Sequence, residues 1–269
     1  MPSPVNNLTH FFRFYLSSLR ASLVREMEFR LNFFLGLLRM ALWAGVFIFQ
    51  LEIIFHNAPS LAGWSKPDVL IIVALSRVIE GMMNAVFSFN IGSLPDEVVT
   101  GKFDFHLIKP LPAQLYMAFR RFRLYDLGNV IIGLVLLVYA FSLKGALPAF
   151  GAWLSFLVLV VSSLVIFYSL LIMISSLVFF IDRLTHVWGF YSIMTEPLTV
   201  PFSIFPPAAR LALTFFLPIA FLVFVPAQAL TGRLAAWHIP TALTLAAIFL
   251  TLANLIWRAG LRRYSSASS

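Results

Sequence analysis

The chain contains no cysteine among its 269 residues, and only 11% of its residues are charged. The absence of cysteine excludes disulfide bonds and thiolate-ligated metal sites. A soluble domain carries about 25% charged residues, so the low charge content argues against a soluble globular protein. Apolar residues take the place of charge, because 61% of the chain is hydrophobic and 29 residues are phenylalanine. This composition is typical of a membrane protein.

Sequence signatures of several enzyme classes are also missing. Gly101-Lys102 lacks the upstream glycine and the following hydroxyl residue of a P-loop, so the chain cannot bind a nucleotide in that way. The five histidines are scattered and show no zinc-ligand spacing, and no serine stands in a G-x-S-x-G elbow. We therefore predict no catalytic residue, no metal site and no cofactor on this chain. Energy for any active transport must come from a partner or an ion gradient.

Long apolar runs occupy most of the sequence. A helix needs about 20 apolar residues to cross the hydrocarbon core of a bilayer, and several runs reach that length. We predict an all-α membrane protein with six transmembrane helices. The predicted spans are Leu31–Phe55, Pro67–Gly92, Leu124–Leu143, Trp153–Ile181, Val187–Val200 and Pro240–Trp257.

Prolines interrupt the apolar sequence after the fifth predicted span. "TEPLTVPFSIFPPAAR" contains four of them, and Pro218 and Pro226 follow. Since proline ends or kinks a helix, we expect short, broken helices between residues 201 and 239. Broken backbone at membrane depth is tolerated where protein or a water-filled cavity covers it.

Residues 1–30 combine apolar and basic side chains. The stretch from Phe11 to Arg30 mixes phenylalanine, leucine and tyrosine with four arginines. This mixture predicts an amphipathic helix that lies in the membrane interface. The predicted organisation is thus an interfacial helix (1–30), a transmembrane domain (31–258) and a polar, basic tail (259–269).

The basic residues are distributed unevenly between the two predicted sides of the membrane. With the N-terminus inside, the inner segments hold thirteen lysines and arginines, and the outer segments hold four. The positive-inside rule then places both termini in the cytoplasm. In this orientation residues 93–123 form the largest cytoplasmic loop. The inner residues are Arg13, Arg20, Arg25, Arg30, Lys102, Lys109, Arg120, Arg121, Arg123, Arg183, Arg258, Arg262 and Arg263, and the outer ones are Lys66, Lys144, Arg210 and Arg233.

The first half of this loop predicts a short helix. Ser93 is a suitable N-cap residue, and Asp96 and Glu97 follow in the first turn, where the helix dipole favours acidic side chains. Gly101 stands where it can stop the helix. We expect a helix from Pro95 to Thr100 that ends in a turn at Gly101.

The second half of the loop alternates apolar and polar residues. This alternation predicts an extended run from Phe103 to Ile108, which Pro110 and Pro112 end. One interpretation is an ordinary loop, with Arg120, Arg121 and Arg123 anchoring the next span at the level of the lipid phosphates. The other is a docking surface for a cytoplasmic partner. The candidate contact residues are Asp96, Glu97, Gly101, Phe103, Asp104, Phe105, Leu107, Lys109 and Pro110.

The order of features in the loop resembles ABC-2-type transporter permeases, and in particular a family of six-span bacterial permeases. The features are a short helix, a glycine, an acidic residue, several apolar residues and Lys-Pro-Leu. The ending "WRAGLRRYSSASS" resembles the end of those permeases, as do the Phe205-Pro206 and Leu217-Pro218 steps in the broken segment. The resemblance covers the whole chain.

The resemblance implies the permease subunit of an ATP-driven ABC exporter in the bacterial cytoplasmic membrane. Such a subunit works with a second permease, identical or homologous, and with a cytoplasmic ATPase dimer that holds the ATP and magnesium. Membrane lipids surround it, and no nucleic acid takes part. The loop 93–123 would be the element that couples the permease to the ATPase, and the N-terminal helix would be the so-called elbow helix.

Three of the charged residues within the predicted spans are candidates for a functional role: Arg77, Glu80 and Glu196. A charge near mid-span costs about 2.5–3.5 kcal/mol on insertion scales, and Arg77 and Glu80, three residues apart, can pair on one helix face. Their pairing is either purely structural, or the two side chains face a second permease or the substrate path. Glu196 is predicted to face a polar cavity or the second subunit.

Two other classes of protein remain as alternatives. A stand-alone secondary transporter or channel often contains internal repeats and several intramembrane carboxylates, whereas this chain has no detectable repeat and offers only Glu80 and Glu196. A membrane scaffold or lipid-modifying enzyme is disfavoured because no catalytic cluster is found.

Overall fold

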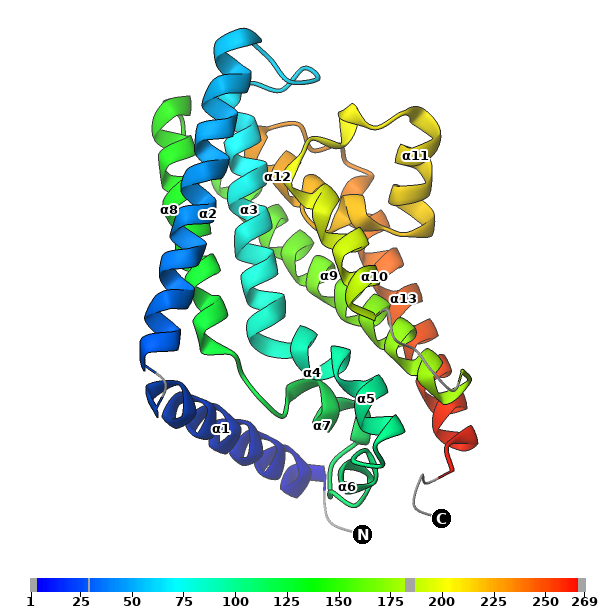
Figure 1. Cartoon of the computed structure of the whole chain (residues 1–269). Coiled ribbons are helices and arrows are strands. Elements are labelled where there is room, and N and C mark those ends of the chain that lie inside the picture. The colour runs from blue at the N-terminus through cyan, green and yellow to red at the C-terminus, as the bar shows by residue number, and fades with distance from the viewer. Residues whose placement is uncertain (1–3, 29, 182–186, 266–269) are drawn as a thin grey trace.

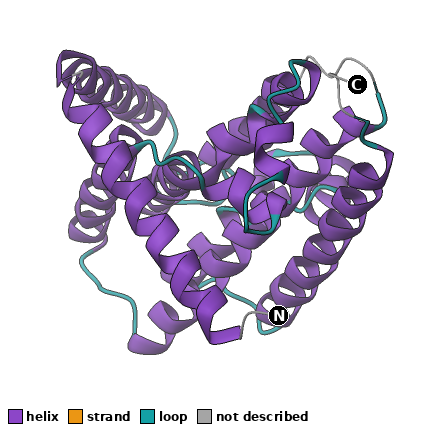
Figure 2. Cartoon of the chain, turned by 90° about the horizontal axis from the view of Figure 1, so that it is seen from below, coloured by secondary structure: helices purple, strands orange, loops and turns teal. Residues whose placement is uncertain are grey.

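The computed structural model of the chain describes residues 4–28, 30–181 and 187–265. Helices are the regular structure in these ranges, which contain no strand, and Figures 1 and 2 show them joined by short loops. The α-helices are α1 (Pro4–Glu28), α2 (Arg30–Asn57), α3 (Lys66–Met83), α4 (Phe89–Gly92), α5 (Leu94–Val99), α6 (Asp104–Leu107), α7 (Ala113–Phe119), α8 (Leu127–Lys144), α9 (Phe150–Ser175), α10 (Val187–Thr195), α11 (Pro207–Leu211), α12 (Phe224–Thr231) and α13 (His238–Arg263).

Short π- and 3₁₀-helical segments extend or join these helices. They are η1 (Asn84–Ser88), η2 (Leu124–Asp126), η3 (Ser176–Phe179), η4 (Glu196–Thr199), η5 (Phe202–Ile204), η6 (Ala212–Phe216) and η7 (Ile219–Phe221). Three of them lengthen spanning helices, since η1 continues α3, η2 precedes α8 and η3 follows α9. The short helices expected between residues 201 and 239 are present as α11, α12 and the segments around them.

Five helical segments in the described residues are long and apolar enough to cross a membrane. They are Phe34–Asn57, Lys66–Val99, Leu124–Lys144, Phe150–Phe179 and His238–Arg263. Each overlaps one of the predicted spans, so the all-α membrane class and five of the six spans are confirmed. The last helix continues to Arg263, and the first part of the predicted polar tail is therefore helical.

The fifth predicted span, Val187–Val200, is not a single spanning helix. Within it α10 covers nine residues and ends at Thr195, where η4 begins with Glu196 and Pro197. A nine-residue helix is about 14 Å long, well short of the roughly 30 Å of the hydrocarbon core. The prolines at 197 and 201 explain the early end, because proline lacks the amide that would continue the helix.

Two ends of the molecule differ in the elements that they carry. In Figure 1 the helix α1 lies across the lower end, where α5, α6 and α7 are found and where α13 ends. We call this the loop end. At the opposite end lie α11 and the residues between α2 and α3. The described chain therefore begins and finishes at the loop end.

The core forms around α3, α8, α9, α12 and α13, whose facing side chains are buried. Residues such as Ile71 and Leu75 on α3 and Phe167 on α9 are inaccessible to solvent. By contrast, α2 exposes large apolar side chains, among them Trp43 and Phe49, at 69% and 66%. A helix that exposes such residues on a protein of this class faces lipid or another subunit.

Glycines allow α3 and α8 to pack closely. A Cβ atom at Gly133 would lie 2.6 Å from the carbonyl oxygen of Ala74, and one at Gly81 would lie 2.9 Å from the backbone nitrogen of Val130. Real Cβ atoms do not approach backbone atoms so closely, so any larger residue would push the two helices apart. Small residues at helix contacts are a recurrent device in membrane proteins, because they let backbones approach.

We predict opposite effects from the same substitution at two helical glycines. Gly133→Ala should lower the thermal unfolding temperature of the purified protein in detergent, because the new methyl group meets the α3 backbone. Gly45→Ala, on α2, has no neighbour within 4 Å and should be neutral or raise that temperature, since alanine is favoured over glycine in helices by about 1 kcal/mol. Equal shifts for both variants would contradict the close packing of α3 and α8.

Candidate functional sites in the loop and the polar cavity

The helix predicted in the loop is α5, and its end at Gly101 is confirmed. Gly101 has a φ of 69°, in the left-handed region that glycine adopts readily. The predicted cap is different, because Ser93 does not cap the helix through its side chain. Its hydroxyl instead donates to the carbonyl oxygen of Asn90, at 2.9 Å, and contacts the carboxylate of Glu97, at 3.2 Å.

The predicted extended run is wrong, because Asp104–Leu107 forms the single-turn helix α6. Phe103, just before it, is fully buried. Its ring lies 5.5 Å from that of Phe179, 6.0 Å from that of Trp257 and 5.3 Å from that of Tyr264. Phe103 therefore cannot contact a partner directly, and it attaches the loop to the ends of α9 and α13.

A buried polar cluster holds the two halves of the loop together. The guanidinium of Arg120 donates to the carboxylate of Glu97 and, at 2.9 Å, to the hydroxyl of Ser93. His106 Nε2 lies 2.6 Å from Glu97 Oε2 and 2.8 Å from Arg120 Nη1. The side chains of Arg120 and Glu97 are 7% and 14% exposed. The interpretation of Arg120 as an anchor at the lipid phosphates is thus wrong, since its charge is used inside the loop.

Other hydrogen bonds tie the loop to its surroundings. Tyr264, beyond the end of α13, donates from its hydroxyl to Asp104 Oδ1 at 2.8 Å. Asn90, on α4, donates from its amide to the carbonyl oxygens of Ala118 and Arg121, at 2.9 and 2.8 Å. The exposed residues of the loop are Asp96, Val99, Thr100, Lys102, Phe105, residues 107–110, Pro112 and Arg121. Of these, Phe105, Leu107 and Ile108 are 64%, 42% and 76% exposed.

The helix α1 is hydrogen-bonded to the loop along one face. Tyr15 and Ser18 donate from their hydroxyls to the carbonyl oxygens of Leu115 and Arg120. Ser22 and Glu26 accept from the backbone amides of Phe122 and Tyr125, both at 3.1 Å. The positions 15, 18, 22 and 26 recur every three or four residues, which places them on one side of a helix. Sequence reasoning missed these residues, although their spacing was a readable signal.

The predicted pairing of Arg77 and Glu80 is confirmed. Arg77 Nη1 lies 3.1 Å from Glu80 Oε2, and both side chains line a cavity of about 580 Å³. Residues of α2, α3, α8 and α10 surround this cavity, which we call the polar cavity. Its polar lining comprises Arg39, Arg77, Glu80, Asn84, Arg123, Tyr125, Asp126, Asn129 and Tyr191.

Glu196 does not belong to the polar cavity. It begins η4, its side chain is exposed, and no ion pair to it is found among the described residues. The structure thus gives Glu196 no cavity to face, contrary to one of the two expectations for it. A role at a subunit contact stays a prediction.

A second charged cluster, at the opposite end, was not predicted. Asp68 on α3 is buried and lies 2.8 Å from Lys144 Nζ, at the end of α8, and 3.2 Å from Arg233 Nη2. Arg233 also lies over the ring of Trp64, 4.2 Å from its centroid. The partners are far apart in the sequence, so no local pattern could have revealed them. Among the described residues, no three histidine, aspartate or glutamate side chains gather as metal ligands.

Comparison with protein families identifies the chain. Residues 41–268 match the sequence model described as ABC-2 family transporter protein. The chain belongs to the ABC-2 family of transporter proteins. Comparisons with curated proteins and with solved structures return no match.

Membership of the ABC-2 transporter family makes the chain a transporter membrane subunit, which is not itself catalytic. The matched residues contain the whole loop 93–123, the polar cavity except Arg39 and Met40, and the cluster around Asp68. The match begins within α2 and leaves α1 outside. The family match therefore says nothing about α1, and its hydrogen-bonded face is seen only in the structure.

We predict that the buried cluster in the loop of this ABC-2 protein is essential to its stability. Glu97→Gln removes the negative charge beside Arg120 and should reduce the free energy of unfolding by roughly 3 kcal/mol, because an arginine is left buried without its counter-charge. Asp96→Asn, at the exposed neighbouring position, should change it by less than about 0.5 kcal/mol. Thermal unfolding in detergent and limited proteolysis of the loop measure both effects. A similar loss in both variants would disprove the special role of Glu97.

Proposed function

We propose that the chain is the permease subunit of an ATP-driven ABC exporter. It works with a second permease, identical or homologous, and with a cytoplasmic ATPase dimer that holds ATP and magnesium. The observation that carries this proposal is the construction of the loop. Its buried side is attached to the helical bundle through Phe103, and its solvent-facing side exposes the apolar side chains of Phe105, Leu107 and Ile108. Family membership supports it, and the export direction rests on the resemblance of the loop and the chain's ending to exporter permeases.

The ATPase can move a membrane helix only through a rigid contact, because a flexible one would absorb the motion. The loop meets this requirement, because Phe103 packs on aromatic rings from η3, which continues α9, and from α13, and Arg120 joins α5 to α6. A force applied to the exposed side of α6 is therefore passed to α9 and α13 through packed groups.

The predicted coupling residues divide into two groups by exposure. Asp96, Phe105, Leu107, Lys109 and Pro110 are exposed, and we assign them to direct contact with the ATPase. Exposed apolar side chains next to charged ones are typical of the core and rim of a protein interface. The remaining predicted residues, Glu97, Gly101, Phe103 and Asp104, fix the loop in position.

The proposed orientation puts the loop end in the cytoplasm. Arginines concentrate there, on α1, in residues 120–123 and at the end of α13, as the positive-inside rule predicts. In this arrangement α1 lies at the inner membrane interface as an elbow helix. The chain crosses the membrane six times, and its fifth crossing is made by α10 together with η4 and η5, covered by neighbouring helices as broken backbone requires.

The polar cavity is proposed as part of the transport path. The paired charges of Arg77 and Glu80 lie beside space rather than being sealed between helices, and intramembrane charges commonly mark substrate pathways. The exposed apolar face of α2, with Trp43 and Phe49, is the surface proposed for the second permease.

Membrane-impermeant maleimide labelling tests the orientation and the fifth crossing. The chain has no cysteine, so single cysteines report without interference. Cysteines replacing Ser60, Ala146 and Ala236 should react on intact spheroplasts, and those replacing Lys102 and Ser265 should react only after permeabilisation. If the cysteine at position 236, like the one at position 102, reacted with the maleimide only after permeabilisation, the prediction of six crossings would be contradicted.

Truncation of the exposed apolar side chains tests the coupling contact. In a reconstituted complex with the ABC ATPase that copurifies from the native host, Phe105→Ser with Leu107→Ser should weaken ATPase association by more than about tenfold. Buried aromatic anchors are worth about 2 kcal/mol or more each at an interface. Transport-stimulated ATP hydrolysis should fall in parallel, and membrane insertion should not change.

The matched control replaces the same residue types at the opposite end. Leu147 and Phe150 are 78% and 85% exposed, and Leu147→Ser with Phe150→Ser should leave ATPase association unchanged. Normal association in the loop variant, or equal loss in the control, would refute the proposed contact. Failure to copurify any ATPase carrying a P-loop would refute the proposed function itself.

A further inference from the structure

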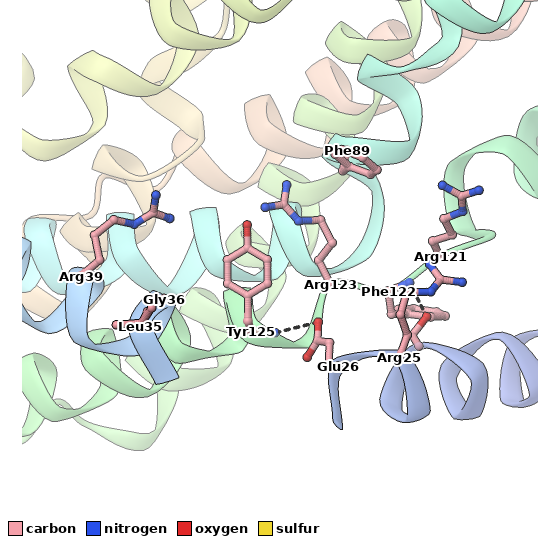
Figure 3. Close-up of a pocket in the computed structure, with 11 residues that line it drawn as sticks. Arg25, Glu26, Leu35, Gly36, Arg39, Phe89, Arg121, Phe122, Arg123 and Tyr125 are labelled. Carbon is pink, nitrogen blue, oxygen red and sulfur yellow. Dashed lines mark hydrogen bonds between the residues drawn. The ribbon is translucent and has the colours of Figure 1, made fainter. Parts of the chain in front are cut away.

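A second pocket, of about 640 Å³, lies between α1, α2 and residues 121–125. Figure 3 shows it with Arg39 and Gly36 on α2 at one side, Arg25 and Arg121 at the other, and Tyr125 and Arg123 between them. We call it the arginine pocket. The lining residues are Ser22, Arg25, Glu26, Leu35, Gly36, Arg39, Phe89, Arg121, Phe122, Arg123 and Tyr125.

Positive charge exceeds negative charge in this pocket, since four arginines and a single glutamate line it. Arg123 is neutralised by Asp126, with Arg123 Nε 3.2 Å from Asp126 Oδ2, and its guanidinium stacks on the rings of Phe89 and Tyr125. Glu26 accepts the backbone amide of Tyr125. Within the described chain neither of these acidic groups forms an ion pair with the other three arginines.

The guanidinium groups of Arg25, Arg39 and Arg121 are therefore left without an ion pair or side-chain hydrogen bond among the described residues. Arg25 and Arg121 also repel each other: burial, and then the positive charges of Arg120 and Arg25, lower the pKa of the Arg121 guanidinium. Holding the like charges of Arg25 and Arg121 on one side of the pocket is unfavourable for the empty protein. A bound anion would remove that cost.

We propose that the arginine pocket binds a phosphate group. Guanidinium groups present forked donors that match phosphate oxygens. Arg25 and Arg121 lie on the same side of the pocket, where they suit such an anion, and Arg39 adds positive charge from the opposite side. The pocket is distinct from the ATPase contact, since its arginines lie on α1, on α2 and in the segment after α7, and not on α6.

Either a lipid headgroup or a free phosphate ester could supply this phosphate. A lipid is favoured by position, because Leu35 lines the pocket and is 52% exposed, and its neighbours Phe34 and Leu38 are 65% and 55% exposed on the same helix. Acyl chains could lie along these residues while the headgroup enters the pocket. Basic side chains at the bilayer surface attract anionic headgroups.

Binding of water-soluble short-chain lipids to the purified chain in detergent tests the proposal. The probes are dioctanoyl phosphatidylglycerol, dioctanoyl phosphatidylcholine and glycerol 3-phosphate, and binding is followed by thermophoresis. Phosphatidylglycerol should bind more tightly than phosphatidylcholine. The triple variant Arg25→Gln, Arg39→Gln, Arg121→Gln should weaken phosphatidylglycerol binding roughly a hundredfold, since each arginine near an anionic headgroup strengthens binding by a factor of about five.

A control with the same change in net charge separates a site from general attraction. Arg13, Arg20 and Arg262 are exposed and do not line the pocket, so their replacement by glutamine should change binding by less than about threefold. Gly36→Leu offers a second test that keeps every arginine. A side chain added there points to Tyr125, whose ring would lie 3.6 Å from the new Cβ, and it should weaken binding by occupying the pocket.

The outcomes are distinguishable from one another and from the proposed function. Binding of phosphatidylglycerol without glycerol 3-phosphate identifies a lipid site, and binding of both identifies a site for free phosphate esters as well. Equal loss in the pocket and control triple variants, or no preference over phosphatidylcholine, would overturn the proposal. Should the triple variant fail to fold, the Gly36→Leu result decides. No ATPase is present in this assay, so its result is independent of the ATPase contact.

Discussion

A buried arginine must be paired, and the loop end of this protein is arranged around that requirement. Arg120 is almost inaccessible, and its guanidinium reaches Ser93 and Glu97 on one side and His106 on the other. The carbonyl oxygen of the same residue accepts a hydrogen bond from Ser18 of α1. One residue therefore connects α1, α5, α6 and the end of α7. An unpaired charge in this position would be strongly destabilising, so these elements keep their positions together.

The spanning helices were largely predictable, because bilayer thickness fixes their length and apolar residues must fill it. The fifth span was not, although its prolines were visible in the sequence. The apolar composition of residues 187–200 predicts one helix, whereas the rise of nine residues in α10 is too small to cross alone. In such a broken segment the prolines determine where each helix ends. Packing against neighbouring helices then determines the direction of the following segment.

Loop residues were predicted with less success, for a physical reason. The alternation after Gly101 is typical of a strand, but Phe103 is placed by aromatic rings from residues 179, 257 and 264. Contacts over such sequence distances leave no local pattern, and the same holds for Asp68 with Lys144 and Arg233. Arg77 and Glu80 could be paired from the sequence because three residues of helix already bring them to one face.

The segment from Arg120 to Asp126 connects the features that the sequence showed only separately. Its first residue closes the cluster in the loop, Arg121 lines the arginine pocket, and Arg123 lines both that pocket and the polar cavity. Tyr125 and, across from it, Arg39 on α2 are likewise shared by the two spaces. A displacement of the loop would thus be transmitted through this short, hydrogen-bonded segment to the walls of the cavity that contains Glu80. Contiguous packing of this kind supplies a physical route from the proposed ATPase contact to the proposed transport path, and α1 is hydrogen-bonded to this segment through Ser18, Ser22 and Glu26.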